Sequence, residues 1–228
     1  MKEENLIKSK NRVQKHGEVF TPSWMVEKML DIPGIKEASE SITATFFEPS
    51  AGDGNFLQAI LERKLKTVTE KYSDKVWKTK SLFALSSIYG VELLEDNLEV
   101  ARARLFLCYL DWYEKSFGSK LETKSDVYQS VYYIIHKNIV RGNTLTQRHP
   151  DTNELIQLNE WQAVKGYPSM VKRVPFTLAE LLGKEVENDP TVVEGQLSFF
   201  DFDETFMADE NTEVFEPISI QEVYLLGE

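Results

Sequence analysis

Apolar residues recur along this chain with two spacings, and the two spacings alternate. Short β-prone runs have the length and composition of buried strands; they lie at about 43–48, 87–92 and 138–140. Between them apolar residues return every three or four positions, which predicts helices; these cover about 54–66, 95–116 and 125–136. Strands that alternate with helices predict an α/β fold with a doubly wound, mostly parallel sheet.

The remaining segments predict smaller elements and three regions. Thr21 is expected to cap a helix whose first turn contains Pro22. The stretch 154–176 predicts a β-hairpin or an irregular insertion, followed by a short helix at 177–182. We expect a flexible basic arm, a folded domain and an acidic tail without a core of its own; their boundaries are 1–16, 17–183 and 184–228.

Composition indicates a globular protein of the cytoplasm. The chain has 228 residues, of which 42% are hydrophobic and 11% aromatic. No apolar run reaches the ~20 residues of a membrane span, and the first residues lack the apolar segment of a signal peptide. Cys108 is the single cysteine, so the chain cannot form an internal disulfide, which suits a reducing compartment.

The net charge of −11 belongs almost wholly to the tail. Residues 184–228 contain thirteen acidic residues and one basic residue. The rest of the chain is close to neutral, with 24 acidic and 25 basic residues. The tail would be repelled by nucleic-acid phosphates, whereas the body can still present a basic face to DNA.

The segment 46–57, Phe-Phe-Glu-Pro-Ser-Ala-Gly-Asp-Gly-Asn-Phe-Leu, is the most informative. A strand that ends in an acid, a glycine turn and a helix N-terminus together predict a site for a nucleotide-like cofactor. Gly52 and Gly54 let the backbone turn sharply and approach a ligand. The third glycine of dinucleotide-binding motifs is absent, and Asp53 would repel a pyrophosphate. Both observations disfavour a nicotinamide-dependent oxidoreductase.

The same segment resembles the AdoMet-binding motif of adenine-specific DNA methyltransferases of the restriction-modification type. That motif has an acidic residue, Pro, a small residue and Gly-x-Gly before Phe-Leu. The resemblance covers about residues 16–145 and implies a Rossmann-like AdoMet methyltransferase fold. It also implies a set of cofactor-binding residues: Phe20, Thr21, Pro22, Glu48, Pro49, Ala51, Gly52, Gly54, Phe56, Glu92 and Asn143.

Three of these assignments have a plainer alternative. The aromatic-Thr-Pro element at 20–22 would close over the methionine end of AdoMet, but Thr-Pro is also a good helix cap. Glu92 matches the acid that binds the ribose hydroxyls, or it is an exposed acid at a strand end; its distance from Glu48 requires an insertion, for which 66–82 has the length. Asn143 aligns with the residue that reads adenine, or it forms a turn.

The catalytic motif of the family is absent from the chain. That motif is Asp, Asn or Ser, two prolines and an aromatic, which hold the flipped base. The nearest segment, Asn188-Asp189-Pro190-Thr191, has one proline and no aromatic, so we reject it and leave the catalytic residues unknown. The resemblance therefore implies an incomplete fold and a split or truncated DNA adenine methyltransferase whose second subunit supplies the catalytic and target-recognition parts. The alternative is a catalytically inactive AdoMet-binding accessory protein.

The tail contains one further motif. Gln196, Leu197, Phe199 and Phe200 resemble the peptide with which bacterial DNA-metabolic proteins dock to the replication sliding clamp. Alternatively, these phenylalanines pack onto the body as a terminal strand. No cluster of cysteine or histidine has the spacing of metal ligands, so no metal site is predicted.

Overall fold

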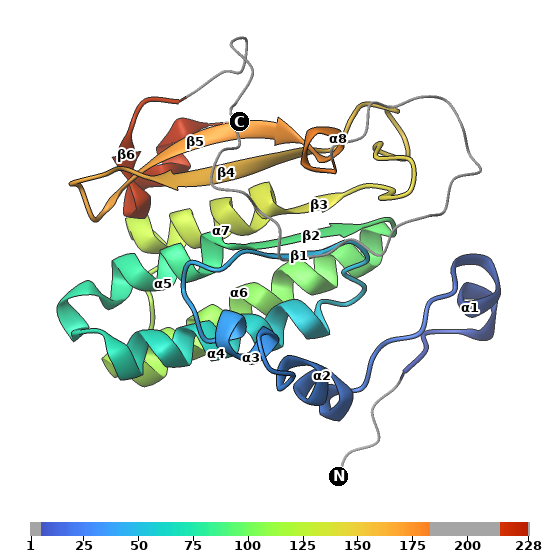
Figure 1. Ribbon diagram of the computed structural model, residues 1–228, viewed down its shortest axis with the longest axis horizontal. Helices are drawn as coiled ribbons and strands as arrows, with labels where there is room; N and C mark the ends of the chain where they lie inside the picture. The colour runs from blue at the N-terminus through green and yellow to red at the C-terminus, as the bar shows by residue number, and fades with distance from the viewer. Residues whose placement is uncertain (1–5, 183–214, 228) are drawn as a thin grey trace.

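A parallel sheet brings the carboxyl ends of its strands to one edge of the molecule (Figure 1). The computed structural model describes residues 6–182 and 215–227. Within these ranges the sheet has the order β1-β2-β3. Phe46 pairs with Ile88, and Glu92 pairs with Arg141. The strands are short: β1 (Phe46–Glu48), β2 (Ile88–Glu92) and β3 (Ile139–Arg141).

Helices connect these strands and precede them. Those before the sheet are α1 (Lys10–His16), α2 (Ser23–Leu30) and α3 (Ile35–Ser39). Those that cross between strands are α4 (Asn55–Lys71), the 3₁₀ turn η1 (Asp74–Val76), α5 (Trp77–Ser86), α6 (Glu95–Phe117) and α7 (Asp126–Asn138). The predicted helices therefore exist, and the charged stretch 66–82 consists of the end of α4, η1 and part of α5.

An antiparallel sheet follows the parallel one in the chain. It has the order β4-β5-β6 and confirms the predicted hairpin. Its elements are β4 (Gln157–Ala163), β5 (Met170–Thr177), the short helix α8 (Leu178–Leu181) and β6 (Ile218–Ser219), which leads into the 3₁₀ helix η2 (Ile220–Leu226).

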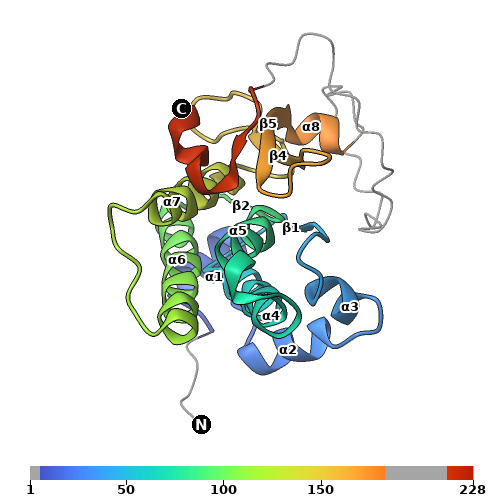
Figure 2. The same cartoon turned by 90° about the vertical axis from the view of Figure 1, so that its left-hand side faces the viewer.

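The central strand β2 is buried on both faces by different partners. A Cβ on Gly90 would lie 2.9 Å from the side chain of Leu57, so α4 packs directly on one face. On the other face the hydroxyl of Tyr89 donates to the carbonyl of Asn159 in β4, at 2.9 Å. Figures 1 and 2 show the antiparallel sheet on one side of β2, with α4 and α6 on the other.

This arrangement differs from the doubly wound sheet that the sequence predicted. A doubly wound sheet has a point where the strand order reverses. The described strands run in one order, so both crossovers proceed in the same direction, and α4 and α6 lie together on one face. The antiparallel sheet covers the opposite face. The α/β class is correct, but in the described ranges the winding is in one direction only.

The N-terminal segment also differs from its prediction as a flexible arm. Residues 10–16 form α1, which Ser9 caps by accepting a hydrogen bond from the amide of Arg12. The next helix, α2, begins at Ser23 with Pro22 as its N-cap residue, so Thr21 does not cap it. Thr21 thus precedes the helix by two positions, in an extended segment.

The end of the acidic tail belongs to the core. Ile220 and Val223 have no exposed surface, and the hydroxyl of Tyr224 donates to Asp126 of α7. The expectation that the tail beyond residue 184 has no core is therefore wrong for residues 218–226. Residues 183–214 lie outside the described ranges.

A buried lysine fixes the approach to β1. Lys64 of α4 is fully buried, and its ammonium nitrogen donates to the carbonyls of Ser41 and Ala44 at 2.7 and 2.6 Å. Burial lowers the pKa of Lys64 to about 7.

Among the described residues, no helix is long and apolar enough to cross a membrane.

Candidate functional site

The turn after β1 crosses over β2 before it enters α4. The amide of Ala51 donates to the carbonyl of Val91 at 2.9 Å, which fixes the turn above the end of β2. Gly52 and Gly54 both have positive φ angles, 55° and 84°. Since an L-residue rarely adopts this conformation, the turn depends on glycine at both positions.

The two glycines are needed for different reasons. A Cβ on Gly54 would lie 2.9 Å from both the Cα and the Cβ of Ala101. Gly54 therefore permits the close packing of the start of α4 on α6. A Cβ on Gly52 would instead meet the ring of Phe20 at 3.5 Å, which is an ordinary contact. Gly52 thus lies on the side of the turn that Phe20 covers.

Glu92 joins the turn after β1 to the loop after β2. Its Oε2 accepts a hydrogen bond from the amide of Gly52 at 2.8 Å, and its Oε1 accepts one from the amide of Leu94 at 2.9 Å. The side chain is buried, since only 5% of the residue is exposed. This burial excludes the alternative of an exposed acid at a strand end. Each carboxylate oxygen still has a second lone pair for a ligand.

Phe20 and Thr21 lie against the same turn. Phe20 is 9% exposed, and its ring faces Gly52. The carbonyl of Thr21 accepts a hydrogen bond at 3.2 Å from the side chain of Asn55, the first residue of α4. The structure therefore brings together Phe20, Gly52 and Glu92, which are far apart in the sequence and which the resemblance assigned to one site.

An ionic cluster fixes the segment before Phe20 to the start of α6. Arg12 contacts Glu18 and donates to Asp96, and Lys8 donates to Asp96 at 2.8 Å. The side-chain amide of Asn97 donates to Glu18 at 3.1 Å. Burial raises the pKa of Glu18, but the hydrogen bonds from Arg12 and Asn97 outweigh it and leave the pKa below its usual value. The carboxyl group is therefore ionised at neutral pH.

The sequence analysis assigned no structural partner to Asp53 and no role to Asn55 or Arg104. In the structure the guanidinium of Arg104 in α6 donates to Asp53 at 2.7 Å and to the side-chain oxygen of Asn55 at 2.5 Å. Asp53 thus stabilises the packing of the turn on α6. The sequence shows Arg104 only as a basic residue on one face of a predicted helix. Its partners could not be predicted, because they depend on how α4 and α6 pack against each other.

Glu48 and Phe56 line a cavity that includes neither Phe20 nor Glu92. They contribute to a cavity of about 570 Å³ between β1, α2, α3 and α4, whose other linings include Met29, Ile35 and Phe46. Burial raises the pKa of Glu48, although a hydrogen bond from the amide of Ser50 partly offsets this. Among the described residues, no hydrogen bond links Glu48 to Gly52 or Glu92.

Asn143 and Pro49 take part in loop contacts. The side-chain oxygen of Asn143 accepts from the amides of Leu145 and Thr146, at 3.0 and 3.4 Å, which is the turn-forming role. The hydroxyl of Thr144 donates to the carbonyl of Pro49 at 2.5 Å and so joins the loops after β3 and β1. Asn143 therefore lies near the same edge of the sheet, with its oxygen already engaged.

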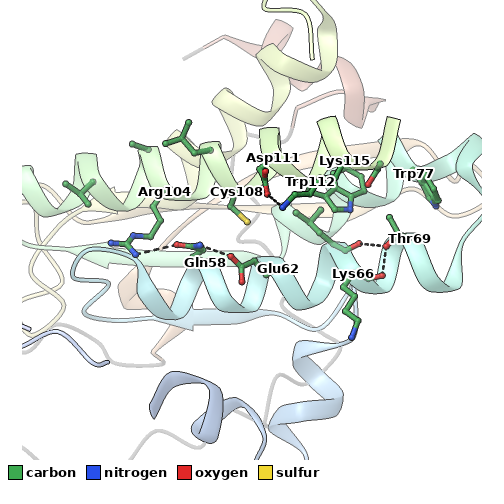
Figure 3. Close-up of a pocket in the computed structure, with 15 residues that line it drawn as sticks. Gln58, Glu62, Lys66, Thr69, Trp77, Arg104, Cys108, Asp111, Trp112 and Lys115 are labelled. Carbon is green, nitrogen blue, oxygen red and sulfur yellow. Dashed lines mark hydrogen bonds and ion pairs between the residues drawn. The ribbon is translucent and has the colours of Figure 1, made fainter. Parts of the chain in front are cut away.

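A larger groove lies between α4 and α6 and has a volume of about 1120 Å³ (Figure 3). Two of its charged residues pair with each other, since Lys115 donates to Asp111 at 2.6 Å, whereas Arg104 pairs with Asp53 outside the groove. Burial raises the pKa of Cys108 to about 12, so its thiol is not a nucleophile at neutral pH. The groove contains none of the residues that the resemblance assigned to the cofactor.

Two further sequence predictions concern the clamp-docking peptide and metal binding. The peptide with Gln196, Leu197, Phe199 and Phe200 lies outside the described ranges. Within those ranges, histidine, cysteine and acidic residues form no group that could hold a metal ion.

A comparison of the chain with models of protein families, with curated proteins and with solved structures returned no match.

Proposed function

We propose that this chain binds AdoMet and is the cofactor-binding part of a DNA adenine methyltransferase with a Rossmann-like fold. One observation carries the proposal. The ring of Phe20 covers Gly52, whose amide is held by the buried carboxylate of Glu92. The resemblance assigned these residues to the lid, the glycine turn and the ribose-binding acid of one site, and their meeting supports that assignment.

The charge of the site favours this cofactor over a phosphate-bearing one. Glu92 is buried and has no ion-pair partner among the described residues. Carboxylates of this kind repel a pyrophosphate and attract the sulfonium and ammonium groups of AdoMet. A carboxylate can also accept both hydroxyls of a ribose.

Methyl transfer to the exocyclic amine of adenine requires groups that hold the flipped base. The chain lacks the family's catalytic motif. We therefore propose a split or truncated enzyme whose second subunit supplies the catalytic and DNA-recognition parts. DNA is the proposed substrate, and the sliding clamp is a proposed partner of residues 196–200.

A second candidate is a catalytically inactive AdoMet-binding accessory protein. The observation in its favour is that the chain lacks the catalytic motif but keeps the residues that the resemblance assigned to the cofactor. Incubation of the isolated chain with tritium-labelled AdoMet and unmethylated DNA separates the candidates. Label transferred to adenine by the chain alone would exclude the accessory function.

Cofactor binding is tested with a pair of matched glycine variants. Gly52→Ala and Gly118→Ala both place an alanine at a positive φ, 55° and 68°, without a close contact. Gly118 ends α6, at the opposite end from the site. We expect titration calorimetry with S-adenosylhomocysteine to show binding by the wild type and by Gly118→Ala, and at least about tenfold weaker binding by Gly52→Ala. An absence of binding by the wild type would refute the proposed function.

A further inference from the structure

Glu18 has an unpaired carboxylate oxygen inside the protein. Its side chain is 6% exposed. The Oε2 atom accepts hydrogen bonds from Arg12 at 2.7 Å and from Asn97 at 3.1 Å. The Oε1 atom is buried and has no hydrogen-bond partner among the described residues. Because an unpaired buried acceptor costs stability, such an atom calls for an explanation.

Glu18 lies on the same buried side of its segment as Phe20, which contacts the turn of the candidate site. Glu18 and Phe20 are buried, whereas Val19 between them is 59% exposed. This alternation of burial places Glu18 and Phe20 on the same, inner side of the segment, and Phe20 faces Gly52.

The partner of Glu18 confirms this direction. Asn97 lies in the first turn of α6, and its amide nitrogen donates to the carbonyl of Leu94. Leu94 is the residue whose amide binds Glu92. Glu18 and Glu92 therefore both contact the segment that joins β2 to α6, at Asn97 and Leu94.

The charges around this loop are not balanced by protein groups. Arg12 is shared between Glu18 and Asp96, and Lys8 is paired with Asp96. No ion pair to Glu92 occurs among the described residues. Arg141 also contacts this loop and pairs with Glu95. Four carboxylates thus face three cations, so a ligand that carries a positive charge is favoured over a neutral or anionic one.

We propose that Glu18 is a further ligand-binding residue and that its Oε1 accepts a hydrogen bond from the ammonium group of the amino-acid part of AdoMet. The proposal rests on the function proposed above and adds a residue that neither the glycine turn nor the ribose-binding acid supplies. An ammonium group donates three hydrogen bonds, and a charge-assisted bond to a buried carboxylate is a strong one.

Because Oε1 is buried, the segment that carries Glu18 must move to admit the ligand. It is held by the hydrogen bond from the amide of Phe20 to the carbonyl of Leu6 and by the ion pairs of Lys8 and Arg12 with Asp96. Asp96 is half-exposed, so these pairs contribute little to stability. The segment before Phe20 is therefore weakly held by these exposed ion pairs, whereas the Glu18 carboxylate is bound to α6 through Asn97.

The experiment uses two ligands that differ in the proposed group. S-adenosylhomocysteine has the ammonium group, and 5′-methylthioadenosine lacks the amino-acid part but keeps the ribose and adenine. We expect Glu18→Gln to weaken the binding of S-adenosylhomocysteine by about 10-fold to 100-fold and that of 5′-methylthioadenosine by less than about twofold, as measured by calorimetry. Asp96→Asn loosens the same ionic cluster but keeps Glu18, and should leave both affinities within about threefold.

The outcomes separate this inference from the proposed function. Unchanged affinity of Glu18→Gln for S-adenosylhomocysteine would overturn the role of Glu18 while the wild type still binds. Equal weakening for both ligands would also overturn it, because the loss would then not concern the ammonium group. Failure of the wild type to bind S-adenosylhomocysteine would refute the proposed function itself. Thermal unfolding of each variant identifies any that does not fold.

Discussion

The packing of the glycine turn on α6 makes a quantitative prediction for Gly54→Ala. The alanine would adopt a φ of 84°, and its Cβ would lie 2.9 Å from the Cα and Cβ of Ala101. A left-handed L-residue costs about 1–2 kcal/mol, and overpacking adds about 1–3 kcal/mol. We therefore expect a loss of about 2–5 kcal/mol in the free energy of unfolding.

Gly118→Ala is the control because it has the same backbone strain without the clash. Its φ is 68°, and nothing lies within 4 Å of the added Cβ. It should cost only the first of the two contributions, about 1–2 kcal/mol. Urea unfolding monitored by circular dichroism measures the free energy of unfolding of both variants, which can be compared if their m-values are equal.

A double variant tests the named contact. Ala101→Gly removes one of the two atoms that the new Cβ would meet, at the helix-propensity cost of about 1 kcal/mol. Combined with Gly54→Ala it should show a favourable coupling of about 1 kcal/mol. If Gly54→Ala were no less stable than Gly118→Ala, the close approach of α4 and α6 at this turn would be refuted.

Three further predictions concern buried charged groups. Burial lowers the pKa of Lys64 to about 7, so above that pH the unfolded chain binds more protons than the folded one. The free energy of unfolding should therefore rise between about pH 7 and 10, by up to about 1.4 kcal/mol per pH unit. Urea midpoints of Lys64→Met should lack this rise. Burial raises the pKa of Glu48, so the stability that its protonated form provides is lost as the pH rises through the raised pKa. Glu48→Gln should therefore be more stable than the wild type at pH 8 in thermal unfolding. Equal or lower stability of the variant would contradict the direction of the pKa shift. Glu92→Gln leaves the amide of Gly52 or that of Leu94 without an acceptor and should lose about 1–3 kcal/mol in urea unfolding, whereas an unchanged midpoint would mean that the carboxylate does not hold the two loops.

Local patterns in the sequence were enough for the elements. The run that ends at Glu48 and the run that ends at Glu92 are parallel neighbours, as alternation of strands and helices predicts. The hairpin of β4 and β5 also follows from its local pattern. These predictions succeed because strand and helix periods are properties of a few adjacent residues.

Long-range pairing was not predictable in the same way. The winding of the sheet depends on which strands become neighbours, and nothing local encodes the antiparallel sheet that covers Tyr89. The burial of Ile220 within an acidic tail depends on α7, about ninety residues earlier. For the site, the motif indicated Gly52 and Glu92, but the hydrogen bond between them and the unpaired oxygen of Glu18 required the coordinates.

The most direct test of the central claim is a crystal structure of the chain with S-adenosylhomocysteine. The account predicts that the nucleoside lies at the turn between Phe20 and Gly52, with its ribose hydroxyls within hydrogen-bond distance of Glu92. A ligand found in the groove between α4 and α6, or one that leaves Glu92 without contact, would contradict the account.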